Sequence, residues 1–105
     1  MTKTKATELM LKHSRAIVDP ALARKIAQAF GYKLSELGIV PQKVCTMGRV
    51  TYSEETAELK GVSMYRVAQE LVRKIFGVEV SSPCNGVGSY AEHTTEMCVE
   101  RLKNN

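Results

Sequence analysis

The sequence lacks the features that define several classes of protein. No apolar run approaches the roughly 20 residues of a membrane span, and no apolar core follows the N-terminal lysines, so we expect neither a membrane segment nor a secretory signal. Three cysteines are an odd number, and Cys45, Cys84 and Cys98 form no CxxC pair. This usage does not indicate a disulfide framework and favours the reducing cytoplasm. No internal repeat, low-complexity segment or linker interrupts the chain.

The size and composition indicate one domain. The chain has 105 residues, 44% of them hydrophobic, which is enough for a single modest core. The formal net charge is +4, and it is unevenly distributed. Residues 1–50 contain nine Lys/Arg and three Asp/Glu, whereas residues 51–105 contain six and eight. The basic half could attract phosphate groups, or it could simply be a solvated surface.

Apolar periodicity predicts an all-α domain of about five helices over residues 1–105, with room for one short β-hairpin. Start and stop signals support these helices: Asp19-Pro20 opens one, Gly31 closes it, Ser63 caps another and Gly77 ends it. Residues 35–38 are expected to form a further turn. Short extended pieces are expected at 49–52 and 78–80. The predicted helices cover residues 4–17, 21–30, 53–60, 64–76 and 89–103.

The spacing of small and β-branched residues within 53–76 is typical of a helix-turn-helix. Ala57 on the first helix would let the second approach, Gly61 would relieve the turn, and Val67 would fill the angle between the helices. A helix that ends at glycine and is followed by a serine-capped helix also occurs in many all-α proteins without any DNA-binding role. Both interpretations remain open for this segment.

Residues 52–67 resemble the DNA-binding motif of MerR-type and excisionase-type regulators. Lys60 and Glu70 depart from that pattern, in which an apolar residue precedes the glycine and a buried residue stands three after Val67. The matching residues are Tyr52, Ser53, Glu55, Ala57, Gly61, Val62 and Ser63.

The resemblance implies a DNA-binding surface on the second helix of the motif. Its start and outer face would read bases in the major groove, and nearby cations would contact phosphates. A single short helix reads few base pairs, so such regulators usually dimerise, and the helix at 89–103 is the spare element that could pair two copies. The implied base-reading residues are Ser63, Tyr65, Arg66 and Gln69, and the implied phosphate contacts are Arg73, Lys74 and Lys60.

No other residue pattern predicts chemistry. Cys84, His93 and Cys98, with Cys45 from afar, lack the spacing of a zinc site. On one helix, His93 and Cys98 would point about 140° apart, which disfavours a catalytic pair. We therefore expect no metal, no cofactor and no catalytic residue.

Two functions are consistent with the sequence. The first is a small bacterial, plasmid or phage transcriptional regulator that binds double-stranded DNA as a homodimer. The alternative is a small helical adaptor that binds a protein partner and no DNA. We expect neither an enzyme nor a membrane protein.

Overall fold

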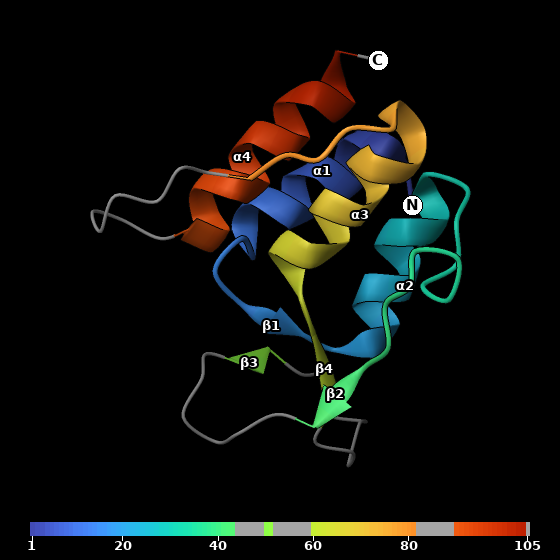
Figure 1. Cartoon of the computed structure of the whole chain (residues 1–105). Helices are drawn as coiled ribbons and strands as arrows, with labels where there is room; N and C mark the ends of the chain where they lie inside the picture. Colours follow the sequence, from blue (N-terminus) through green and yellow to red (C-terminus); the bar gives the residue numbers. More distant parts are fainter. Residues whose placement is uncertain (44–49, 52–59, 82–89, 105) are drawn as a thin grey trace.

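A computed structural model describes residues 1–43, 50–51, 60–81 and 90–104 of the chain. Helices dominate this part, and a small sheet of very short strands lies at one end of them (Figure 1). The prediction of a mostly helical fold is confirmed, although the described ranges hold four helices rather than five. The elements are α1 (Lys3–Lys12), β1 (Ile17–Val18), α2 (Pro20–Ala29), β2 (Gln42–Lys43), β3 (Val50–Thr51), β4 (Lys60–Ser63), α3 (Met64–Phe76) and α4 (Tyr90–Lys103).

The sheet has the strand order β2-β4-β1-β3. β4 pairs antiparallel with both β2 and β1, and β1 pairs parallel with β3. Val18 lies opposite Val62, and both side chains are buried, so this β-branched pair fixes the register at the centre. The extended piece expected near residues 49–52 is confirmed as β3, whereas residues 78–80 form no strand.

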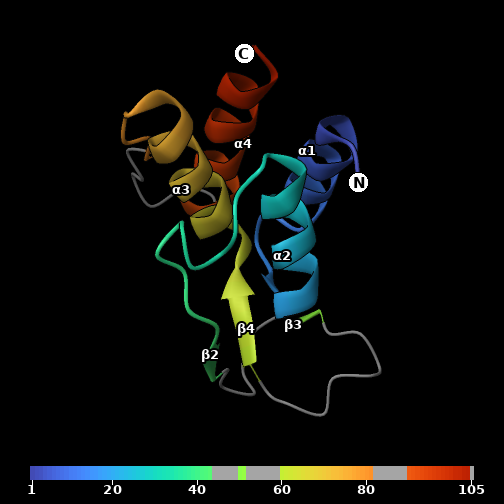
Figure 2. The ribbon, with the colours of Figure 1, turned by 90° about the vertical axis from the view of Figure 1, so that its right-hand side faces the viewer.

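Gly61 lies in a strand, so the turn predicted there is wrong. It pairs with Gln42 across the β2–β4 ladder, and it is buried. A buried glycine inside a strand allows neighbouring backbone to approach closely, which the sequence pattern does not distinguish from a turn. β4 then continues directly into α3 (Figure 2). Of the first helix predicted over 53–60, only Lys60 lies within the described residues, and it belongs to β4.

The apolar stripe predicted on residues 64–76 forms the centre of the core. α3 buries five side chains on one face and packs against α4, α2, α1 and β4. Gly77 has a left-handed φ of 70° and ends the helix as predicted. Ser63 stands at the N-cap, although within the described ranges its side chain makes no capping hydrogen bond. The buried side chains of α3 are Met64, Val67, Ala68, Leu71 and Val72.

α1 is shorter than the predicted helix at 4–17. It ends at Lys12, and the chain turns through residues 13–16 before Ile17 and Val18 enter the sheet. Two consecutive β-branched residues favour a strand over a last helical turn, which explains the early end. α4 matches the predicted helix at 89–103, and its buried side faces α3 and α1 of the same chain. Within the described residues, no helix has both the length and the apolar character needed to cross a membrane.

The start of α2 follows the predicted signal. The Oδ1 atom of Asp19 accepts a hydrogen bond of 2.8 Å from the backbone N–H of Ala21, and Pro20 occupies the first turn. Asp19 is 4% exposed, so water could not easily take the place of its carboxylate as the hydrogen-bond acceptor if the side chain were removed. We expect Asp19→Ala to lower the free energy of unfolding by about 1–2 kcal/mol. Urea denaturation measures this change. The control is Thr2→Ala at the exposed N-cap of α1, which should lower the free energy of unfolding by only about 0.5 kcal/mol.

Candidate functional site

The outer face of α3 is partly covered by the start of α4. The rings of Tyr65 and Tyr90 meet edge to face, with centroids 5.7 Å apart and an interplanar angle of 81°. The Nε2 atom of Gln69 donates to the carbonyl oxygen of Val80 at 3.0 Å and to the hydroxyl of Tyr90 at 3.3 Å. Two of the predicted base-reading side chains are therefore engaged within the fold, where they fix α4 and the segment after α3 against α3.

Arg73, a predicted phosphate contact, is paired with carboxylates. Its guanidinium hydrogen-bonds with Glu79, and it lies 3.8 Å from a carboxylate oxygen of Glu70 one turn earlier. The Glu70 side chain is 21% exposed, and Glu70 directly follows Gln69, a predicted base-reading residue, on α3. Two carboxylates offset the charge that Arg73 would offer to a phosphate.

The remaining predicted DNA contacts lie on α3, on β4 and at the junction between them. Arg66 and Lys74 are exposed on α3, and Lys60 is exposed on β4. Ser63 is half-buried at the junction of β4 and α3, where its backbone pairs with Ile17. Four of the seven predicted side chains are thus exposed cations on two different elements, and one of these, Arg73, is ion-paired. The other three, Ser63, Tyr65 and Gln69, serve the fold.

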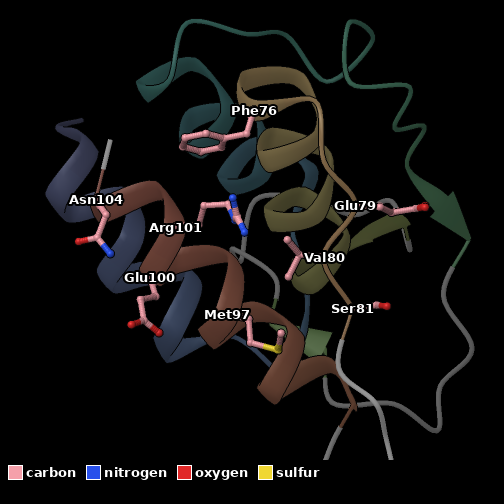
Figure 3. Close-up of a pocket in the computed structure, with 8 residues that line it drawn as sticks. All are labelled: Phe76, Glu79, Val80, Ser81, Met97, Glu100, Arg101 and Asn104. Carbon is pink, nitrogen blue, oxygen red and sulfur yellow. The ribbon is translucent and has the colours of Figure 1, made fainter.

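A pocket of about 630 Å³ lies between the end of α3, the segment after it and α4 (Figure 3). The guanidinium of Arg101 stands 5.9 Å from the ring centroid of Phe76, which is within the range of a cation–π contact. Met97, 43% exposed, comes from the same face of α4. Glu79 and Glu100 also line the pocket, so its charges are of both signs. This mixture does not select a ligand of one charge.

A second concave surface, which we call the α2 groove, lies between α2 and residues 32–41. Two motifs of the Schellman type shape it, one at the end of α2 and one at the turn of residues 34–38. The N–H of Tyr32 donates to the carbonyl of Ala27 across Gly31, and the N–H of Ile39 donates to the carbonyl of Leu34 across Gly38. Both glycines have left-handed φ values, 88° and 70°, as Schellman motifs require. The predicted stop at Gly31 and the predicted turn at 35–38 are confirmed, and together they fold the chain back beside α2.

Apolar side chains form the walls of the α2 groove. Leu34 and Ile39 are buried beneath it, whereas Val40 is 68% exposed at its edge, the highest exposure among the large apolar side chains of the described residues. The volume of the α2 groove is about 690 Å³, within the range of sites that hold a ligand or an anchoring side chain. The lining residues are Arg24, Gln28, Tyr32, Lys33, Leu34, Ser35, Gly38, Ile39, Val40 and Pro41.

The polar side chains of the α2 groove are at its rim. Arg24 and Gln28 project from α2, Lys33 and Ser35 project from the turn, and all four are exposed. No acidic residue lines the groove within the described chain. Sequence reasoning missed this surface because it treated the segment as a helix with a glycine stop. The available signal was the apolar Val40-Pro41 pair that follows the turn at residues 35–38.

The described residues do not bring the cysteine and histidine candidates together. No group of three or more His, Cys, Asp or Glu side chains among them could hold a metal ion. Cys98 is buried on α4, His93 is exposed, and Cys45 and Cys84 lie outside the described residues. Burial raises the pKa of the Cys98 thiol to about 11, partly offset by the nearby positive charge of Arg101.

The raised pKa of Cys98 predicts an unreactive thiol. Relative to the ordinary value of 9.0, a pKa of about 11 lowers the thiolate fraction at pH 8 by about 100-fold. In a Cys45→Ser/Cys84→Ser background, we expect iodoacetamide to label the native chain at least about 100-fold more slowly than the urea-unfolded chain. Mass spectrometry at timed intervals measures both rates, and equal rates would contradict the burial of Cys98.

No protein-family model, curated protein or solved structure matches this chain in the comparisons.

Proposed function

We propose that the chain is a small protein-interaction module that binds a partner segment in the α2 groove. The observation that carries this proposal is the exposed Val40 beside a concave apolar surface. Protein interfaces combine an apolar centre with a polar rim, and the groove has that arrangement, with Tyr32 and Pro41 at the walls and cations outside them. A module of this kind needs no catalytic residue, metal or cofactor, and its odd cysteine count suits the cytoplasm.

The shape of the α2 groove also favours binding. The two Schellman motifs close residues 27–39 with backbone hydrogen bonds, so the surface exists before a partner arrives. A preformed surface loses less conformational entropy on binding. A groove of this size holds only part of a partner, so we expect the complex to be weak or transient.

A displayed library of random 12-residue peptides, selected on the full chain, tests the proposed function. We expect enriched peptides whose affinity falls at least about 10-fold with Val40→Asp, because a buried carboxylate beside Ile39 would be desolvated. The matched control is Val78→Asp, since Val78 is also exposed, at 38%, but does not line the groove. Equal losses in both variants, or no enrichment at all, would contradict this function.

DNA binding by a homodimer is the second candidate. The exposed Arg66 and Lys74 on α3, and the formal charge of +4, favour it. Cations of this kind would contact phosphates of double-stranded DNA rather than read bases. Titration with a fluorescent 20-bp duplex at about 50 and 200 mM salt tests this candidate. The affinity of a DNA binder should fall steeply as the salt concentration rises, and the fall should be smaller in Arg66→Gln/Lys74→Gln. Absence of binding at low salt would exclude this candidate.

A further inference from the structure

We infer that the α2 groove selects a peptide segment in which acidic side chains stand next to apolar ones. The apolar side chains would occupy the space above Leu34 and Ile39, and the carboxylates would face Arg24 and Lys33 at the rim. This inference rests on the proposed function and adds the chemistry of the partner to it.

The charge of the groove supports an acidic partner. Within the described ranges, neither the Arg24 nor the Lys33 side chain is paired with a carboxylate. Two other arginines of the chain do have carboxylate partners: Arg15 lies 3.7 Å from Glu92, and Arg73 is paired with Glu79. The groove therefore presents two cations and, among the described residues, no lining acid, and complementary charges favour an acidic segment over a basic one.

A carboxylate in the same turn as Lys33 has another role. Glu36 is exposed, and its Oε1 atom accepts a hydrogen bond of 3.0 Å from the backbone N–H of Lys33. It caps the turn at 33–38 and does not line the groove. Glu36 thus stabilises the backbone that carries Lys33, and the Lys33 side chain lines the groove.

The position of the polar groups favours a peptide over a small molecule. Sites for small molecules place a few buried polar groups inside an enclosed cavity, where they orient the ligand. In the α2 groove, the Arg24, Gln28, Lys33 and Ser35 side chains are all exposed at the rim, around an apolar centre. This arrangement matches one half of a protein interface. The pocket beside Phe76 differs, because acids and a cation share its lining.

Three fluorescent ten-residue peptides test the inference on the full chain. The first alternates Asp/Glu with Leu/Phe, the second replaces each acid with Asn/Gln, and the third replaces each acid with Lys. We expect the acidic peptide to bind about 10-fold more tightly than the amide peptide, and the lysine peptide to bind most weakly. Fluorescence anisotropy at fixed salt gives the three dissociation constants.

Two variants with equal charge changes separate the groove from the general charge of the protein. Arg24→Gln/Lys33→Gln should reduce the preference for the acidic peptide to below about 3-fold. Lys12→Gln/Lys103→Gln, on exposed positions of α1 and α4 that do not line the groove, should leave it unchanged. A preference that both double variants reduce equally would overturn the inference.

The outcomes distinguish the inference from the proposed function. If the acidic and amide peptides bind equally and Val40→Asp weakens both, the groove binds peptides without selecting charge, and only the inference fails. If none of the three peptides binds, and the displayed library yields no peptide whose binding Val40→Asp weakens, both the inference and the proposed function fail. If Arg24→Gln/Lys33→Gln reduces the preference for the acidic peptide and Lys12→Gln/Lys103→Gln does not, both the inference and the proposed function are supported.

Discussion

Leu71→Ala is expected to lower the free energy of unfolding by about 2–5 kcal/mol. Leu71 is 0% exposed and lies in the middle of α3, the helix that contacts α1, α2, α4 and β4. Shortening this side chain to alanine loses the free energy of burying its apolar atoms. It also leaves a cavity that the surrounding elements can fill only in part. Small domains are stable by only about 5–15 kcal/mol, so this one change removes a large part of the total.

Urea denaturation followed by circular dichroism measures the effect. Lys74→Ala is the control, because Lys74 is exposed on the same helix and alanine keeps the helix propensity. We expect the control to change stability by less than about 0.5 kcal/mol. A loss below about 1 kcal/mol for Leu71→Ala would contradict the central place of α3 in the core.

Gly38→Ala is expected to cost about 1–2 kcal/mol and to weaken peptide binding in the α2 groove. Gly38 has a φ of 70°, and a Cβ there would meet nothing within 4 Å, so the cost comes from the backbone conformation rather than from a clash. Relieving that strain would loosen the turn that places Ile39 and Val40 beside α2.

Gly77→Ala provides a matched control for this effect. Gly77 also has a φ of 70°, a Cβ added to it would likewise meet nothing within 4 Å, and it ends α3 rather than the groove turn. Both variants should lose similar stability in urea, while only Gly38→Ala should weaken an enriched peptide, by about 3-fold or more. Equal binding by the two variants would show that the turn does not shape the groove.

The helices were largely predictable from local signals. The Asp19-Pro20 start gives α2, and the apolar stripe ending at Gly77 gives α3 at residues 64–76. Both signals act within a few residues: a side chain caps a free N–H, or a left-handed glycine ends a helix. Periodicity therefore places these helices without knowledge of the rest of the fold.

The strands and the site depended on distant contacts. Lys60–Ser63 becomes a strand because β1 and β2, far away in sequence, pair with its two edges. Likewise, the sequence predicts Gln69 only as an outward-facing polar residue. Its hydrogen bonds to the carbonyl of Val80 and the hydroxyl of Tyr90 depend on segments that are distant in sequence. The α2 groove was missed for the same reason: its walls combine a helix face with residues 32–41, and only the two Schellman motifs bring them together.

The most direct test of the α2 groove as the binding surface is amide chemical-shift mapping of the full chain titrated with the acidic, apolar peptide. We predict that the largest shifts fall on Arg24, Tyr32, Ile39 and Val40 and that they saturate with one peptide per chain. Shifts centred on Arg66 and Lys74 of α3, or no shifts at all, would contradict it.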